Sequence, residues 1–289
     1  MSAQTGCAVV TGASSGIGLE TAKALAAMGW RVIGVGRDPQ RCAAALADIR
    51  AAAPGADVDM LRADLALMRD TARLAKDIEA RTDHIDVLLN NAGGTPKERV
   101  VTSEGNEATF AGNHLGHFLL TNRLLPLLRA AAAKQPRGRV RIINTASSAH
   151  EYSAGLDWGD LQMLNNFVTN QAYCNAKLAT VLFTRALAKR VAAQGIVVHA
   201  AHPGLVDTRF ASHGDDLMQQ YFAQNAARAI SAKEGADTVI WLATAREPGE
   251  TTGGYFFQRA PGTVSPLARD DAAAERLWIE SEALSARGA

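Results

Sequence analysis

The first two hundred residues repeat one pattern of hydrophobic and polar positions. Short apolar runs rich in Val and Ile alternate with longer runs rich in Ala and Leu. A continuous apolar run predicts a strand buried on both faces, and the longer runs predict the helices that cover it. The predicted strands occupy residues 7–11, 31–36, 57–61, 85–90, 139–147 and 196–204, and the predicted helices 16–28, 39–52, 66–81, 104–132 and 170–194.

The pattern is less regular after residue 204. A polar and aromatic stretch to about 230 precedes a predicted helix over 232–245, a short strand at 253–257 and a last helix near 270–285. We find no linker, internal repeat or low-complexity segment. We therefore expect a single α/β domain over 1–289, a doubly wound Rossmann fold with a mainly parallel seven-stranded sheet and helices on both faces.

Composition narrows the classes of partner. The chain has 289 residues, 47% of them hydrophobic, and a net charge of +1. It can bury a large core, and its charge gives no reason to expect nucleic acid or anionic lipid as partner. No apolar run approaches the ~18 residues of a membrane span. Cys7, Cys42 and Cys174 lack CxxC spacing, so we expect reduced packing residues of a cytoplasmic protein.

Three glycines stand where the first strand becomes the first helix. Gly12, Gly16 and Gly18 form the pattern T-G-x-x-x-G-x-G, which differs from the common GxGxxG fingerprint. Glycine lets the backbone approach a pyrophosphate, and the helix N-terminus beyond presents free N–H groups. An ordinary tight turn is the alternative. The position of the glycines at the first strand-to-helix junction favours a dinucleotide site.

The end of the second strand indicates which dinucleotide. Gly36 stands where NAD-binding folds carry an acidic side chain for the ribose hydroxyl, and Arg37 follows it. A guanidinium can pair with the 2′-phosphate of NADP(H), which is the cofactor that we expect. Asp38, directly before Pro39, is predicted to cap the next helix. The alternative is that Arg37 is only a solvated loop charge.

Tyr173 and Lys177 are four residues apart in a predicted helix, so they share one face. A free tyrosine has a pKa of ~10. A neighbouring ammonium group is expected to lower that pKa towards the range useful for acid–base catalysis. Ser147 and Ser148 follow the fifth strand, at the sheet edge where open α/β folds bind ligands.

These motifs, in this order, resemble those of the short-chain dehydrogenase/reductase family over essentially the whole chain. The resemblance implies that Tyr173 is the proton donor, that Ser148 binds the substrate oxygen, that Lys177 holds the nicotinamide ribose and that Asn113 anchors a water. The cofactor contacts that it implies are Gly12, Ser14, Ser15, Gly16, Ile17, Gly18, Arg37, Asp64, Leu65, Asn91, Ala92, Gly93, Tyr173, Lys177, Pro203, Gly204, Val206 and Thr208.

Two segments are similar to the retinol-dehydrogenase branch of that family: the run "LDWGDLQ" between Ser148 and Tyr173, and the C-terminal "SPLARDDAAAERLW". The resemblance implies an NADP(H)-dependent oxidoreductase acting on a small, lipophilic carbonyl or alcohol. Because the first strand begins at residue 7, we expect a soluble relative without the anchor of the animal members. A non-catalytic NADP-binding regulator, or a dedicated ketoreductase of a biosynthetic or catabolic pathway, is the alternative.

Two segments, 149–170 and 205–230, are predicted to flank the substrate, with His150, Trp158 and Phe210 touching it. Their large side chains form either a lid or a satellite core beneath long loops: Tyr152, Leu156, Trp158, Met163, Phe167, Phe210, Met218, Tyr221 and Phe222. His114 and His117 lack a third ligand at metal spacing, so we expect no metal. In the family, subunits pair through the helices matching 104–132 and 170–194, which implies a homo-oligomer, either a dimer or a tetramer.

Overall fold

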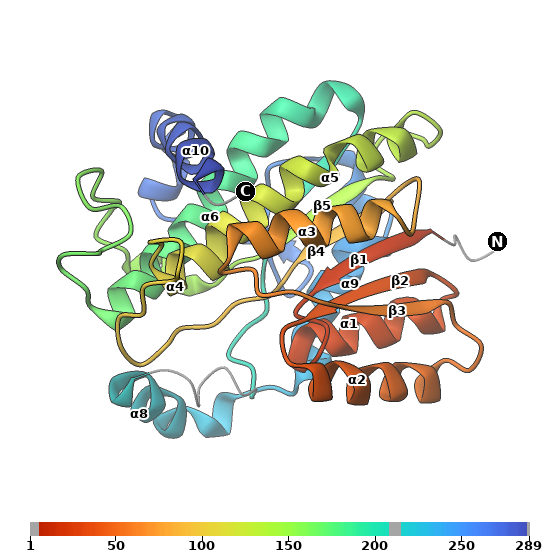
Figure 1. Ribbon diagram of the computed structural model, residues 1–289, viewed down its shortest axis with the longest axis horizontal. Helices are drawn as coiled ribbons and strands as arrows, with labels where there is room; N and C mark the ends of the chain where they lie inside the picture. Colours follow the sequence, from red (N-terminus) through yellow and green to blue (C-terminus); the bar gives the residue numbers. More distant parts are fainter. Residues whose placement is uncertain (1–5, 208–214, 288–289) are drawn as a thin grey trace.

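The sheet confirms the predicted α/β fold. A computed structural model describes residues 6–207 and 215–287. Its eight strands lie in the order β3-β2-β1-β4-β5-β6-β7-β8 (Figure 1). The first seven pair in parallel and β8 is antiparallel to β7. The strands are β1 Cys7–Thr11, β2 Arg31–Gly36, β3 Val58–Arg62, β4 Val87–Asn90, β5 Arg141–Thr145, β6 Val197–His202, β7 Tyr255–Phe257 and β8 Ala260–Pro261.

The eighth strand is the one element of the sheet that the sequence pattern did not predict. It follows a two-residue turn at Gln258 and Arg259, whose φ angles of 50° and 60° match a tight hairpin. A strand of two residues, one of them Pro261, has no alternation to detect. It extends the predicted seven-stranded sheet at one edge.

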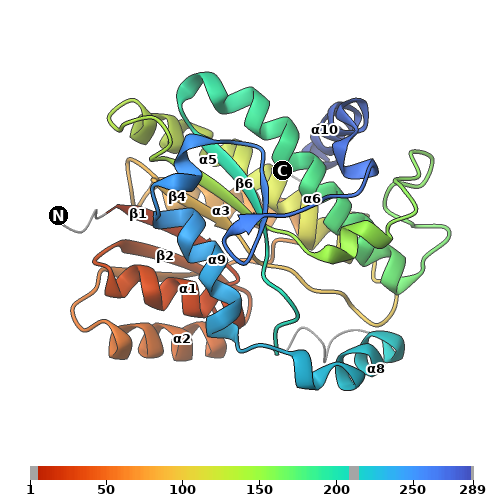
Figure 2. The same cartoon turned by 180° about the vertical axis from the view of Figure 1, so that it is seen from behind.

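Helices cover both faces of the sheet, as Figures 1 and 2 show: α1, α2 and α9 on one face, and α3, α5 and α6 on the other. The short helix α8 lies apart from both layers (Figure 2). The bounds are α1 Gly16–Ala27, α2 Pro39–Ala52, α3 Met68–Glu79, α4 Ala108–Phe110, α5 Gly116–Ala132, α6 Thr169–Val191, α8 Asp216–Gln224, α9 Ala232–Thr244 and α10 Asp271–Ala286.

Neighbouring residues of a strand supply opposite cores, which explains the continuous apolar runs. In β1, Val9 belongs to the core beneath α3, α5 and α6, whereas Val10 belongs to the core beneath α1 and α9. The same split separates Ile33 from Val32 in β2. Side chains alternate between faces along a strand, so a sheet covered on both sides needs apolar residues at every position.

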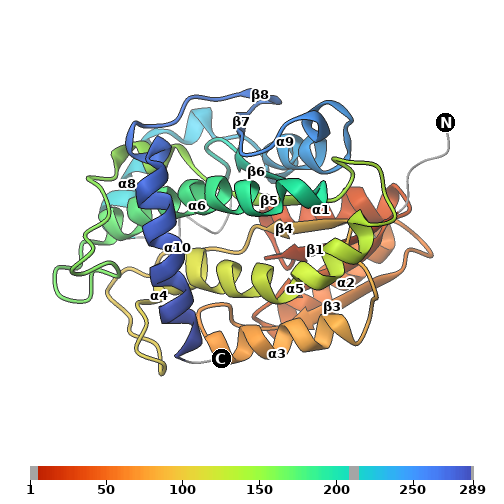
Figure 3. The ribbon, with the colours of Figure 1, turned by 90° about the horizontal axis from the view of Figure 1, so that it is seen from above.

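The C-terminal helix α10 forms an extra layer across α5 and α6 (Figure 3). The ring of Trp278 lies 4.9 Å from that of Phe118 and 5.9 Å from that of Phe183, and the Arg190 guanidinium lies 4.0 Å over it. The chain's own α10 therefore covers part of the outer faces of α5 and α6, through which subunits were expected to pair. No helix within residues 6–207 and 215–287 is long and apolar enough to cross a membrane.

Candidate active site

The predicted glycine, serine and Tyr–Lys motifs come together at the carboxyl edge of the sheet, because the parallel strands β1 to β7 all end there. The glycine turn follows β1, Gly36 ends β2, and the serine pair follows β5. The crevice outside these carboxyl ends is where open α/β sheets bind their ligands.

The glycine turn has the geometry of an anion cradle. Gly12 and Gly16 have φ angles of 70° and 55°, and a Cβ on Gly18 would lie 2.4 Å from the Gly12 carbonyl oxygen. The side chain of Ser15, the N-cap of α1, makes no capping hydrogen bond, and the first turn carries no acidic residue. The N–H groups of this 12-residue helix are thus free of side-chain caps, as a pyrophosphate would require.

The turn after β4 is hydrogen-bonded to the end of β1. The Thr11 hydroxyl accepts the N–H groups of Asn91 and Ala92 at 2.8 and 3.0 Å, and the Asn91 amide donates to the Thr11 carbonyl at 3.0 Å. A Cβ on Gly93 would lie 2.6 Å from Asn113 Oδ1. Asn91, Ala92 and Gly93 are therefore held between the glycine turn and Asn113.

No carboxylate can occupy the end of β2. A Cβ on Gly36 would lie 2.6 Å from Cys42 Sγ and 2.8 Å from Ser14 Cβ. The next carboxylate, Asp38, accepts the N–H of Arg41 at 2.8 Å, which confirms the predicted helix cap. A ribose-binding acid of the NAD type is thus absent from this strand end.

Arg37 lies beside the residue expected at the adenine. Its guanidinium, 69% exposed, is 3.7 Å from a carboxylate oxygen of Asp64. The other Asp64 oxygen accepts the N–H of Ala66 at 3.0 Å, and Leu65 between them is buried. At the end of β2, the exposed guanidinium of Arg37 is therefore available to a bound anion.

Further along the edge, Gly204 has a φ of 91°, and its N–H lies 3.4 Å from His202 Nδ1, while Pro203 lies between these two residues. Val206 is buried and bridges to Ile230. Thr208, the remaining predicted cofactor contact, lies outside the described residues.

Tyr173 and Lys177 lie together near the amino end of α6, inside the protein. Lys177 Nζ donates to the Thr145 carbonyl at 2.9 Å and lies 5.6 Å from the centre of the Tyr173 ring. Burial lowers the pKa of Lys177 to about 8. Burial also raises the pKa of Tyr173, and a hydrogen bond with Ser147 only partly offsets this. The net direction is opposite to the expected lowering, because desolvation of the phenolate outweighs nearby groups.

The serine bonded to Tyr173 is Ser147, whereas we predicted Ser148 for this position. Ser147 precedes the short 3-10 helix Ser148–Tyr152 with extended backbone, and its hydroxyl also accepts the N–H of Ala149 at 3.1 Å. Both serines follow the same strand, so their order in the chain does not distinguish them. The packing of this helix against α6 decides which one faces Tyr173.

Asn113 lies in a π-helix, Ala111–Leu115, in place of the uninterrupted helix predicted over 104–132. Its side-chain amide donates to the carbonyls of Gly94 and Thr109, both at 2.7 Å. Its Oδ1 is buried and has no hydrogen-bond partner. The wide turn brings Asn113 against Gly93.

The residues predicted to touch substrate have different environments. His150 is fully buried; its Nδ1 bonds the Ser147 carbonyl at 2.7 Å and its Nε2 lies 3.4 Å from the N–H of Ser265. Trp158 lies 4.6 Å beneath the Arg276 guanidinium of α10 and packs on the main core. Trp158 is thus a half-buried ring packed against the main core, and its contact with substrate stays a prediction. Phe210 lies outside the described residues.

Two aromatic groups near the site were missed by the sequence analysis. The ring of Tyr255 lies 5.1 Å from that of His150, and its hydroxyl is buried with no hydrogen-bond partner. His202 stacks on Phe257 at 4.8 Å, and burial, with the nearby charges of His150 and Lys177, lowers its pKa to about 4. Tyr255 comes from β7, far along the chain, and only the pairing of β6 with β7 brings it here.

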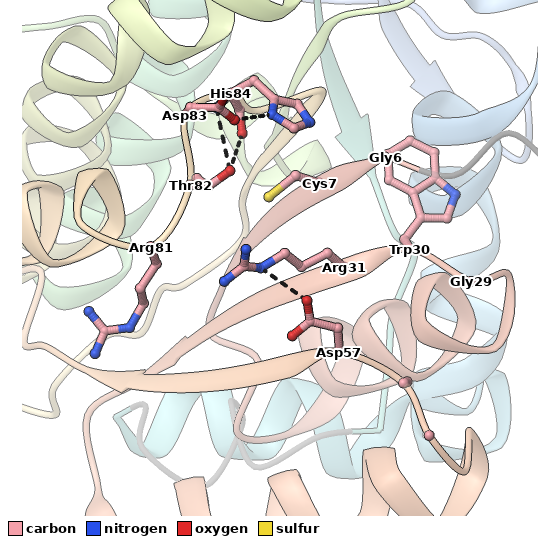
Figure 4. Close-up of a pocket in the computed structure, with 12 residues that line it drawn as sticks. Gly6, Cys7, Gly29, Trp30, Arg31, Asp57, Arg81, Thr82, Asp83 and His84 are labelled. Atoms are coloured by element: carbon pink, nitrogen blue, oxygen red, sulfur yellow. Dashed lines mark hydrogen bonds and ion pairs between the residues drawn. The ribbon is translucent and has the colours of Figure 1, made fainter.

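A cavity of about 650 Å³ opens at the opposite, amino edge of the sheet (Figure 4). Cys7, Trp30, Arg31 and His84 line it, together with eight other residues. It contains none of the predicted site residues. Cys7 is a free, buried cysteine, as are Cys42 and Cys174. Within the described part of the chain, no three His, Cys, Asp or Glu side chains are grouped to hold a metal.

Comparisons with known proteins agree with this geometry. A family model for short chain dehydrogenase matches residues 6–217. Human retinol dehydrogenase 13 is 37% identical over 283 residues, which cover 96% of this chain and 83% of that protein. Human retinol dehydrogenase 12 is 36% identical over 280 residues, covering 96% and 86%.

A solved structure, the Pseudomonas aeruginosa RhlG/NADP active-site complex, superposes with a TM-score of 0.69 at 30% identity, covering 86% of this chain and 93% of that one. The family match extends over most of the sheet and both strand ends that carry the serine and glycine motifs. The chain belongs to the short-chain dehydrogenase/reductase family and is similar to its retinol-dehydrogenase branch.

Proposed function

We propose that this chain is an NADP(H)-dependent oxidoreductase that interconverts a lipophilic carbonyl compound and its alcohol, with Tyr173, Ser147, Lys177 and Asn113 as its catalytic residues. The observation that carries the proposal is the half-buried Tyr173, hydrogen-bonded to Ser147 beside Lys177. The family membership supports a dehydrogenase or reductase acting on alcohols and carbonyls.

The environment of Tyr173 suits proton donation in the reductive direction. The raised pKa keeps the phenol protonated at neutral pH, and an alkoxide is a far stronger base than a phenolate. Ser147 can hydrogen-bond the same oxygen and so hold it near Tyr173. We propose Ser147 for this role in place of Ser148, because Ser147 is the serine that contacts the phenol.

A nicotinamide cofactor supplies the hydride when it is bound at this edge of the sheet. The residues present fit such a cofactor: the uncapped start of α1 beyond Gly12, Gly16 and Gly18 suits its pyrophosphate. Lys177, with a pKa of about 8, remains mostly protonated at pH 7 and is placed to bind ribose hydroxyl groups. Asn113 packs against Gly93 and donates a hydrogen bond to the Gly94 carbonyl, so it supports the turn after β4.

The preference for NADP(H) rests on the end of β2. There is too little space around Gly36 for the side chain of an acidic residue, and Asp38 is engaged in its helix cap. The Arg37 guanidinium is largely exposed. A 2′-phosphate would meet a positive charge there and no competing acid from this strand. The NADP complex of the Pseudomonas aeruginosa relative supports the same preference.

Lipophilic substrates are proposed from the names of the retinol dehydrogenases that the chain resembles over 96% of its length. Several exposed apolar side chains also lie in segments near the site, among them Val100, Val101 and Val168. The Thr169 hydroxyl bonds the Lys97 carbonyl at 3.0 Å, which brings the segments of these valines together.

The test follows nicotinamide absorbance with purified protein. NADPH and NADH are offered separately against aliphatic, aromatic, steroid and retinoid carbonyls, and NADP⁺ against the matching alcohols. Turnover with NADPH that is lost in Tyr173→Phe supports the proposal. Ser147→Ala should lose activity where Ser148→Ala keeps it. Tight NADPH binding with no turnover of any compound would contradict an enzymatic role.

A matched binding experiment tests the cofactor preference. Arg37→Ala should weaken NADPH binding by roughly tenfold or more, the value of a lost charge-assisted hydrogen bond, and leave NADH binding unchanged. Arg41→Ala, which removes a half-buried guanidinium of α2 paired with Asp38, is the control. Equal weakening of both cofactors by Arg37→Ala would refute the assignment of Arg37 to the phosphate.

A further inference from the structure

We propose that His117 is a positioning residue that fixes the backbone carbonyl of Asn113 and joins it to the cofactor-binding turn after β4. His117 lies four residues beyond Asn113, is the second residue of α5, and is buried. Its Nδ1 is 3.1 Å from the Asn113 carbonyl oxygen, and its Nε2 is 3.1 Å from the Thr11 hydroxyl. This inference rests on the proposed function, in which Asn113 is part of the site.

The partners determine which ring nitrogen carries the proton. A carbonyl oxygen can only accept, so the bond to Asn113 requires a proton on Nδ1. Burial lowers the pKa of His117 to about 4, and the charge of Lys177 acts in the same direction, so the ring is neutral at pH 7. A neutral imidazole protonated on Nδ1 has an acceptor at Nε2, and the Thr11 hydroxyl is the donor to it.

The Thr11 hydroxyl can bond all of its neighbours because of its own donor and acceptor capacity. A hydroxyl has one proton and two lone pairs. The Thr11 hydroxyl lies 3.1 Å from two acceptors, His117 Nε2 and the Leu89 carbonyl, which share its single proton. Both of its lone pairs remain available for the N–H groups of Asn91 and Ala92, at 2.8 and 3.0 Å. One side chain thus connects the end of β1, the turn after β4 and the helix that carries Asn113.

The connection matters because the helix at Asn113 has an unfavourable geometry. The N–H of Gly116 bonds the Ala111 carbonyl, five residues back, and such wide turns are less stable than ordinary helix. Asn113 Oδ1 already faces Gly93 so closely that no Cβ would fit between them. If the turn relaxed towards an ordinary helix, Asn113 would shift relative to Gly93, and shifts of this kind near reacting groups cost large factors in rate.

His114 provides a matched control in the same π-helix. It is also a buried histidine, and its Nε2 bonds the hydroxyl of Ser281 on α10 at 2.7 Å. It contacts the rings of Phe110 and Phe183, and no cofactor-binding turn. Its removal should lower the stability of the fold without the effect on the site that we expect from His117.

The first test does not depend on activity. Nitrogen-15 spectra of histidine-labelled protein at pH 7 should contain two rings that are protonated on Nδ1 and unprotonated on Nε2, those of His117 and His150, because both Nδ1 atoms bond backbone carbonyls. Only the signal of His117 should be missing from His117→Asn, and His150 remains as the internal reference. An imidazolium, or a proton on Nε2, would overturn the inference. This result is independent of whether any substrate is turned over.

The second test compares three variants with a substrate that the wild-type protein reduces. His117→Leu should lower kcat roughly tenfold or more, with a smaller change in the Kd of NADPH. His117→Asn should recover most of kcat, because an asparagine here can reach the carbonyl four residues back, as Asn122 reaches Phe118 at 2.9 Å. His114→Leu should keep kcat within about twofold while lowering Tm.

Retention of full kcat by His117→Leu, or an equal loss in His114→Leu, would overturn the inference. Absence of turnover in the wild-type protein would instead contradict the proposed function. The spectra at pH 7 would still decide the tautomer and the bond to Asn113.

Discussion

Replacing Lys177 by Met should stabilise the folded protein at pH 7 although it removes a proposed catalytic group. Lys177 is 5% exposed, and its Nζ donates a hydrogen bond to the Thr145 carbonyl at 2.9 Å. Burial lowers its pKa from 10.5 to about 8. At ~1.4 kcal/mol per pKa unit, holding the charged form in the fold costs about 3 kcal/mol.

Part of the stabilisation gained by removing the buried charge is lost, because the variant also lacks the hydrogen bond of Lys177. Methionine has nearly the same length and shape, but the Thr145 carbonyl loses a donor, which costs ~1 kcal/mol. The net change in the free energy of unfolding is about +2 kcal/mol at pH 7. For a large domain this corresponds to an increase in Tm of about 4 °C or more.

The effect has a definite pH dependence. Below about pH 8 the lysine is charged in both folded and unfolded chains, so the wild-type protein bears the full penalty. Between about pH 8 and 10.5 the folded form loses its proton first, and wild-type stability rises relative to that of the variant. The difference between the two proteins should therefore shrink with rising pH.

Urea denaturation at pH 7 and pH 10 measures both quantities. Lys233→Met replaces an exposed lysine of α9 and should change the free energy of unfolding by less than about 0.5 kcal/mol at either pH. The reasoning would be refuted if Lys177→Met were less stable than wild type at pH 7. It would also be refuted if the difference in the free energy of unfolding between the two proteins were the same at pH 7 and pH 10.

Three other outcomes follow from the packing. Gly18→Ala should abolish NADPH binding, measured by fluorescence, because its Cβ would lie 2.4 Å from the Gly12 carbonyl oxygen; binding within tenfold of wild type would contradict the cradle. Trp278→Ala should lower the free energy of unfolding by about 3–5 kcal/mol in urea denaturation, since the ring is packed against two phenylalanines and an arginine; a loss below 1 kcal/mol would show that α10 is loosely held. Cross-linking at micromolar concentration should not join two copies through the parts of α5 and α6 beneath Trp278, because α10 packs there, and a dimer cross-linked at those residues would contradict this.

Local chemistry was sufficient for the elements near the cofactor site. The continuous apolar strands identified a sheet covered on both faces, and Asp38 before Pro39 identified a helix start, because both depend on neighbours in the chain. The glycine spacing likewise describes a turn formed by consecutive residues, and the structure has positive φ at Gly12 and Gly16. The family resemblance, made on such motifs, is confirmed by the family match over residues 6–217.

Local chemistry was not sufficient where two distant segments meet. The sequence analysis chose Ser148 from an adjacent pair, but contact with α6 selects Ser147. It did not reveal that Arg276 of α10 lies 4.6 Å over the ring of Trp158. It expected a lowered pKa for Tyr173 from Lys177 nearby, but the direction depends on burial, which no spacing of two residues reveals.

By itself, then, the sequence determined the seven parallel strands in their chain order, the glycine turn, the helix cap and the presence of Tyr173 and Lys177 on one helical face. Each of these follows from residues within a few positions of one another. Only the tertiary structure decided which serine meets Tyr173, that α10 covers α5 and α6, and that the helix at Asn113 widens against Gly93. Those features depend on the packing of segments far apart in the chain, where shape and desolvation outweigh local preference.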